Sequence, residues 1–177
     1  MPVPEHCVYA ALLRAVNVGG TGKLPMADLK ALCIAVGFVG VRTYIASGNV
    51  IFASDLVATE VKSVLESALL HYAGKPVGVV VRTEAEIAAV LAANPFPSEA
   101  PNRVMAIFLD DHPPHDALAQ VTGARDEQLA LGVREIYVHY GQGMADSKLK
   151  IPAAKSGTAR NMNTVAALVN IAVELTA

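Results

Sequence analysis

The sequence is poor in the residues that would indicate several common classes of protein. Only two of its 177 residues are cysteines, Cys7 and Cys33, and they lie far apart without a second cysteine close by. This spacing predicts neither a zinc site nor a disulfide framework. Cys33 falls on the same predicted helix face as Leu29 and Val36, so we expect it to be a buried packing residue.

Charge is also scarce, and neither sign dominates. Charged residues make up 17% of the chain, with 14 Lys and Arg against 16 Asp and Glu and a formal net charge of −2. A protein that binds nucleic acid without regard to sequence normally carries a basic excess, so the charge argues against nucleic acid as a partner. The low charged fraction favours an extensive core, and it leaves a homodimer surface open as an alternative.

Long apolar runs are missing as well. No run approaches the roughly 20 residues that cross a bilayer, and residues 1–6 show no basic stretch followed by an apolar one. We therefore expect a cytoplasmic protein without a membrane partner. Hydrophobic residues nevertheless account for 53% of the chain, which is typical of a folded protein and not of a disordered one. The length fits a single domain or two small packed halves.

The first half shows the order strand, helix, two strands, helix, strand. Strands are predicted over 7–14, 41–46, 49–53 and 77–81, and helices over 25–36 and 55–72. Pro25 suits a helix start, Gly37 suits a helix end, and Ser47-Gly48 indicates a short hairpin turn. This β-α-β-β-α-β order is the ferredoxin-like arrangement.

The second half repeats part of this order. A connecting helix over 83–93 begins at Thr83, and the elements that follow are a strand over 104–109, a short helix over 114–121, a hairpin of 128–131 and 135–139, and a closing helix over 163–175. Residues 140–162 are more polar and are assigned to no strand. We therefore predict one α+β domain over 1–177. Its ferredoxin-like N-terminal half covers about 1–83, its connecting helix 84–94, and its related β-α-β-β-α C-terminal half about 95–177.

The glycine-rich segment after the first strand has the place of a phosphate-binding P-loop but lacks its residues. That motif requires glycine at the position of Asn17 and serine or threonine at the position of Leu24, so we expect no nucleotide hydrolysis of that type. An anion site built from the amides of Gly19 and Gly20 together with Lys23 is left open. The alternative is that the glycines only make the turn.

Metal and cofactor chemistry finds no support in the sequence. His112 and His115 are separated by two prolines, and no cluster of carboxylates or cysteines accompanies them. Because metal sites need three or more ligands of matched geometry, we interpret the pair as part of a surface turn and expect no cofactor.

The polar residues that simple packing does not explain fall into three groups, which also carry a family resemblance. The groups are Arg14, Asn17 and Lys23; Tyr44, Ser47 and Asn49; and a C-terminal set made of Ser147, Lys148, Thr158, Arg160, Asn161, Asn163 and Thr164. The stretches at 13–20 (Leu-Arg-Ala-Val-Asn-Val-Gly-Gly), 23–26, 42–50, 94–96, 147–149 and 158–164 closely resemble a family of small bacterial proteins of unknown function (domain of unknown function 1697). The resemblance covers nearly the whole chain. It implies an α/β fold related to the ferredoxin-like one and no agreed activity. Ala46 and Met162 depart from it, because members of the family commonly carry Gln and Trp there.

If the three groups converge, they form a polar, cationic pocket with few acids. We expect such a pocket to bind an unidentified anionic small molecule that carries a phosphate or a carboxylate, with help from the amides at the start of the last helix. The candidate ligand-binding residues are Arg14, Asn17, Gly19, Gly20, Lys23, Tyr44, Ser47, Asn49, Lys148, Arg160, Asn161 and Asn163.

Other interpretations of the same residues stay open. Asn17 and Asn49 could cap turns, Asn161 could cap the last helix, and Arg14 could pair with an acid between the halves. An enzyme acting on a phosphorylated or carboxylated metabolite would use Tyr44 or Lys23 as acid or base, although the sequence shows no activating partner for either. A homodimeric interaction protein would use the apolar surplus, and a nucleic-acid-associated protein would need a continuous basic stripe.

Overall fold

The computed structural model describes residues 6–17, 23–141 and 143–176. Two compact units share the chain: unit 1 comprises Met1–Ile87 and Leu168–Ala177, and unit 2 comprises Ala88–Ala167. Both divisions fall inside helices, namely α3 (Glu84–Ala92) and α4 (Met162–Thr176). The end of α4 therefore belongs with unit 1, although the sequence analysis placed it in the C-terminal half.

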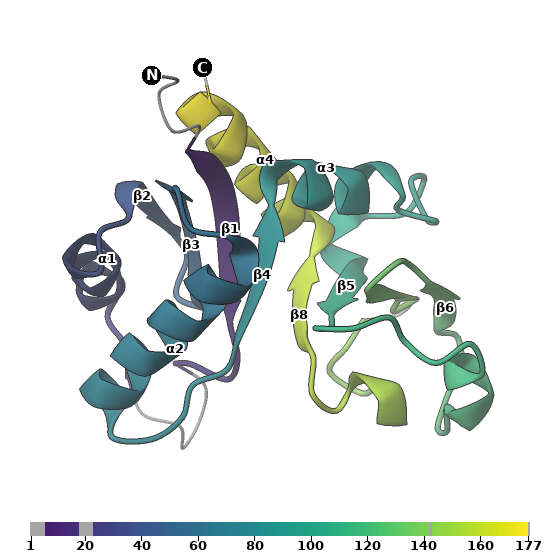
Figure 1. Cartoon of the computed structure of the whole chain (residues 1–177). Coiled ribbons are helices and arrows are strands. Elements are labelled where there is room, and N and C mark those ends of the chain that lie inside the picture. The colour runs from purple at the N-terminus through teal and green to yellow at the C-terminus, as the bar shows by residue number, and fades with distance from the viewer. Residues whose placement is uncertain (1–5, 18–22, 142, 177) are drawn as a thin grey trace. The chain divides into compact units, whose positions relative to one another are not determined.

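Unit 1 contains a four-stranded antiparallel sheet in the order β2-β3-β1-β4. Its strands are β1 (Cys7–Leu13), β2 (Val39–Tyr44), β3 (Asn49–Ser54) and β4 (Val79–Thr83). Helices α1 (Met26–Ala35) and α2 (Ala58–Ala73) pack on one face of this sheet (Figure 1). The α+β class predicted from the sequence is confirmed.

The core of unit 1 lies between that sheet face and the two helices. Alternate residues of β1 point into it, and α2 contributes a stripe of buried residues at every fourth position: Val61, Leu65 and Leu69. Phe38 and Phe52 stack with their ring centroids 4.1 Å apart. Cys33 is fully buried in the same cluster, which confirms its predicted packing role.

The helix ends follow local sequence signals. Thr83 and Glu86 form a reciprocal capping box at the start of α3, with Glu86 N–H donating to Thr83 Oγ1 at 3.2 Å and Thr83 N–H donating to Glu86 Oε1 at 3.1 Å. This confirms Thr83 as the predicted cap. Gly74 ends α2 in the left-handed conformation, with φ +71°.

Unit 2 contains a second four-stranded antiparallel sheet, in the order β6-β7-β5-β8. Its strands are β5 (Val104–Phe108), β6 (Gln128–Leu131), β7 (Glu135–His139) and β8 (Thr158–Asn161), and its 3-10 helices are η1 (Pro101–Arg103), η2 (Ala117–Gln120) and η3 (Pro152–Ala154). Ile107, Leu109, Ile136 and Val138 form a small core, which is covered in part by residues of the 149–154 segment.

Three predicted elements differ from the structure. Residues 158–161 form β8, where no strand was predicted, because the strand buries polar side chains: Arg160 donates to Thr158 Oγ1 at 2.7 Å and to the Ala159 carbonyl at 2.9 Å. The helix predicted over 114–121 is only the 3-10 helix η2. The β2–β3 connection comprises 45–48 and not Ser47-Gly48 alone, since β2 ends at Tyr44 and Ile45 has φ +50°.

Within the described residues, no helix has the length and hydropathy needed to cross a membrane.

Gly48 lies where the β2–β3 turn meets the end of β1. Its φ is +90°, and its carbonyl accepts a hydrogen bond from the Leu13 N–H at 2.8 Å. A Cβ at this position would lie 2.6 Å from Val16 Cγ2 and 2.9 Å from Leu13 Cβ. Both the backbone angle and the available space therefore require glycine.

We predict that Gly48→Ala lowers the free energy of unfolding by about 2–4 kcal/mol, because a strained positive φ is combined with overpacking. Gly74→Ala is the matched control: φ is also positive there, but nothing lies within 4 Å of the added Cβ. It should cost only about 1 kcal/mol. Denaturant unfolding followed by circular dichroism measures both, and equal losses would contradict the steric argument.

The two cysteines should differ sharply in reactivity. Burial raises the pKa of the Cys33 thiol to about 12, whereas Cys7 is exposed. Because the thiolate is the reactive form, one thiol per chain should react with a thiol-specific disulfide reagent at pH 8 in the native state, and two after denaturation. The native Cys7→Ser variant should show no fast reaction; fast labelling of that variant would contradict the burial of Cys33.

Candidate functional site

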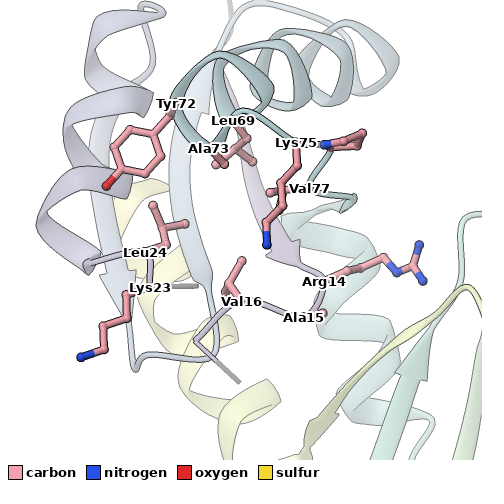
Figure 2. Close-up of a pocket in the computed structure, with 11 residues that line it drawn as sticks. Arg14, Ala15, Val16, Lys23, Leu24, Leu69, Tyr72, Ala73, Lys75 and Val77 are labelled. Carbon is pink, nitrogen blue, oxygen red and sulfur yellow. The ribbon is translucent and has the colours of Figure 1, made fainter. Parts of the chain in front are cut away.

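A hollow of about 610 Å³ opens in unit 1 beside the end of β1 (Figure 2). Four segments supply its walls: the chain that leaves β1, the approach to α1, the last turns of α2, and the connection from α2 to β4. The described residues that line it are Arg14, Ala15, Val16, Lys23, Leu24, Leu69, Tyr72, Ala73, Lys75, Pro76 and Val77.

The charged side chains among these described lining residues are all cations: Arg14, Lys23 and Lys75. Figure 2 shows the Lys75 amine in the middle of the labelled residues, whereas the ends of Arg14 and Lys23 point to opposite sides. Asp28, in the first turn of α1, is an acid tied to the hollow through Tyr72. It accepts a hydrogen bond from the Tyr72 hydroxyl at 2.5 Å.

That hydrogen bond sets the state of Tyr72. Donation to Asp28, with a smaller contribution from desolvation, raises the pKa of the Tyr72 hydroxyl above its ordinary value. Tyr72 is therefore a neutral donor at physiological pH, and it links the last turn of α2 to the first turn of α1.

The floor of the hollow is apolar. Val16, Leu24 and Leu69 are buried and belong to the core of unit 1, and Val77 packs against that core. The hollow thus combines an apolar floor with cationic side chains, which is the composition of a typical small-molecule site.

Asn17 does not line the hollow but holds two of its walls together. Its Nδ2 donates to the carbonyls of Leu24 and Ala46, both at 2.8 Å, and its Oδ1 accepts from the Leu24 N–H at 2.6 Å. Asn17 has φ +55°, a conformation that asparagine tolerates better than most residues. The side chain of Asn17, which was predicted to bind a ligand, fixes the approach to α1 against the end of β1.

Gly78 contacts Arg14 at the end of β1, on the side of the strand that pairs with β4. The Arg14 N–H donates to the Gly78 carbonyl at 2.9 Å. A Cβ on Gly78 would lie 2.9 Å from Arg14 Cδ, so a larger residue there would require the arginine side chain to shift. No local pattern in the sequence distinguishes Gly78 from an ordinary strand residue.

The predicted group at the β2–β3 turn is engaged within that turn. Asn49 is fully buried, and its Nδ2 donates to the Tyr44 carbonyl at 2.8 Å and to Ser47 Oγ at 2.9 Å. This confirms the alternative in which Asn49 caps a turn. None of the three residues is among those that line the hollow.

The remaining predicted residues lie elsewhere. Gly19 and Gly20 are outside the described residues. In unit 2, Asn161 Oδ1 accepts from the Thr164 N–H at 2.9 Å and so caps α4, as the alternative interpretation proposed. Burial lowers the pKa of the Arg160 guanidinium to about 10. Lys148 and Asn163 are exposed.

The hollow also contains residues that sequence reasoning missed, chiefly Tyr72 and Lys75. The sequence around these two residues does not indicate a site. A lysine after a helix end, such as Lys75, is explained by the helix dipole alone. Across the described ranges, no group of three or more His, Cys, Asp and Glu side chains could hold a metal ion.

Comparison with known proteins identifies a family whose function is unknown. The model of the family described as "Protein of unknown function (DUF1697)" matches residues 7–137. No curated protein matches the chain. Among solved structures it is similar to the conserved bacterial protein SP0830 from Streptococcus pneumoniae, with a TM-score of 0.78 and 23% identity over 95% of this chain and 99% of that chain. At this identity the likeness concerns the fold.

If Asn17 is a structural clamp, its loss should cost stability with no ligand present. We predict that Asn17→Ala lowers the free energy of unfolding by about 2 kcal/mol, since three backbone hydrogen bonds are lost. Asn17→Gly also removes the hydrogen bonds but keeps the positive φ accessible. Comparison of the two variants therefore separates the loss of the hydrogen bonds from the cost of the backbone conformation. Asn163→Ala, at an exposed amide, should change stability by less than about 0.5 kcal/mol. Similar values for the Asn17 and Asn163 variants in urea unfolding would be inconsistent with the clamp.

Proposed function

For this chain, which belongs to the DUF1697 family of proteins of unknown function, we propose that the hollow of unit 1 binds a small anion bearing a phosphate or a carboxylate. One observation carries the proposal: the described residues that line the hollow include three cations and no acid. In a chain with a net charge of −2, such a one-sided distribution favours a negatively charged ligand.

The backbone adds to this electrostatic preference at one wall and opposes it at another. α1 begins at Met26, two residues after the lining residue Leu24, so the positive end of its dipole lies on that side. α2 ends at Ala73, where the dipole is negative. Lys75 follows that end, and its positive charge opposes the negative end of the dipole. We propose that the three lining cations together supply the affinity for the anion.

We also infer that both units are variants of the ferredoxin-like arrangement. Their strand orders, β2-β3-β1-β4 and β6-β7-β5-β8, place the first strand of each unit between the third and the fourth, with antiparallel neighbours throughout. In unit 2, the 3-10 helices η2 and η3 stand in the two positions that helices occupy in unit 1. This difference supports a ligand site in unit 1, where full helices provide walls.

Thermal unfolding in the presence of a defined anion panel tests the site. We expect at least one of inorganic phosphate, methyl phosphate, phenyl phosphate, benzoate and citrate to raise the melting temperature, because a ligand that binds the native state stabilises it. Lys75→Ala should weaken binding about tenfold, and Arg14→Ala and Lys23→Ala should weaken it less, because their ends point away from the centre.

Lys30→Ala supplies the matched control for net charge. Lys30 is an exposed lysine of α1 that does not line the hollow, so its removal changes the total charge equally without touching the site. Binding should be unchanged in this variant. The proposal fails if no anion in the panel shifts the melting temperature, or if Lys30→Ala weakens binding as much as Lys75→Ala does.

A further inference from the structure

We propose that the anion bound in unit 1 carries an aromatic ring that lies against Tyr72. This inference rests on the proposed function, because it names the chemical class of the ligand for the same hollow. Three properties of the hollow carry it: its volume, its apolar floor, and the way in which Tyr72 is held.

The volume is too large for a bare anion. Pockets that hold organic ligands typically span about 300–1,000 Å³, and the hollow of about 610 Å³ lies in the middle of that range. An inorganic phosphate ion would occupy a small part of this space and leave the rest to water. A ligand that fills the hollow must therefore have an organic body in addition to its charged group.

The floor determines the chemistry of that body. Ala73 and Pro76, which are exposed, and Val77, which is half-buried, present apolar surface at the end of α2, next to the buried side chains of Val16, Leu24 and Leu69. Polar ligand groups placed against this surface would lose their hydration without gaining partners. An apolar body would instead remove both surfaces from water, which is favourable.

Tyr72 provides the flat surface for an aromatic body. Tyr72 lines the hollow and is 43% exposed, so part of its surface is open to a ligand. The hydroxyl donates a hydrogen bond to Asp28, so it is engaged with α1 and the ring is held in one orientation. A second ring placed against it gains an aromatic contact in addition to area burial. Lys75 lines the same hollow as Tyr72, so the charged group of the same ligand has a cationic partner there.

Two phosphate monoesters that share a charged group but differ in body test the inference. Titration calorimetry on the full chain, at one pH and one ionic strength, compares phenyl phosphate with methyl phosphate. We expect phenyl phosphate to bind at least about tenfold more tightly, since burial of its ring adds apolar area and an aromatic pair. Tyr72→Ala should reduce this preference to about threefold or less, while the affinity for methyl phosphate stays within about twofold.

Two further variants keep the interpretation specific. Tyr72→Phe retains the ring and should restore most of the preference. Leu70→Ala removes a side chain of similar exposure (48%) from the same helix, outside the residues that line this hollow, and should leave both affinities unchanged. The melting temperature of each variant reports whether it is folded.

The possible results separate the two proposals. If neither ester binds, the inference is overturned, and the proposed function falls with it only if no other anion of the panel raises the melting temperature. If both bind with equal affinity and Lys75→Ala weakens both, the anion site stands and the aromatic ligand class is overturned. A preference for phenyl phosphate that survives in Tyr72→Ala overturns the assignment of Tyr72 as the contact surface.

Discussion

The pairing of β1 on both of its edges is the constraint on which the rest of unit 1 depends. β1 is hydrogen-bonded to β3 on one side and to β4 on the other. The pattern continues at the strand end, where the Leu13 N–H donates to the Gly48 carbonyl and the Arg14 N–H donates to the Gly78 carbonyl. The chain therefore leaves the sheet at a fixed point, and the residues that follow form the first wall of the hollow.

Both carbonyl groups that accept these two hydrogen bonds belong to glycines. A side chain at Gly48 would collide with Val16 and Leu13, and one at Gly78 would collide with the side chain of Arg14. The absence of two Cβ atoms thus lets the turn before β3 and the segment before β4 approach the end of β1 closely. Asn17 then ties the next segment to the same place through the Leu24 backbone. The polar residues at this position therefore stabilise the fold. The cations beside them are held in place by that fold.

Part of this could be predicted from the sequence. The α+β class, the order of the elements in unit 1, the cap at Thr83 and the burial of Cys33 all follow from patterns a few residues long. The site could be predicted only in part: Arg14 and Lys23 line the hollow, whereas Tyr72 and Lys75 were not anticipated. β8 was missed because its buried Arg160 looks like a loop or ligand residue until its hydrogen bonds to Thr158 and Ala159 are seen.

The sequence by itself determined what depends on near neighbours: helix caps, turn glycines, and which face of each helix or strand is apolar. Those properties arise from backbone angles and side-chain periodicity, which act over a few residues. Only the tertiary structure decided that Arg14 and Lys75 line one hollow and that Asn17 closes on the Leu24 backbone and on Ala46. The physical reason is that these contacts require β1 to insert between β3 and β4, and the pairing of strands distant in sequence is not encoded in any single segment.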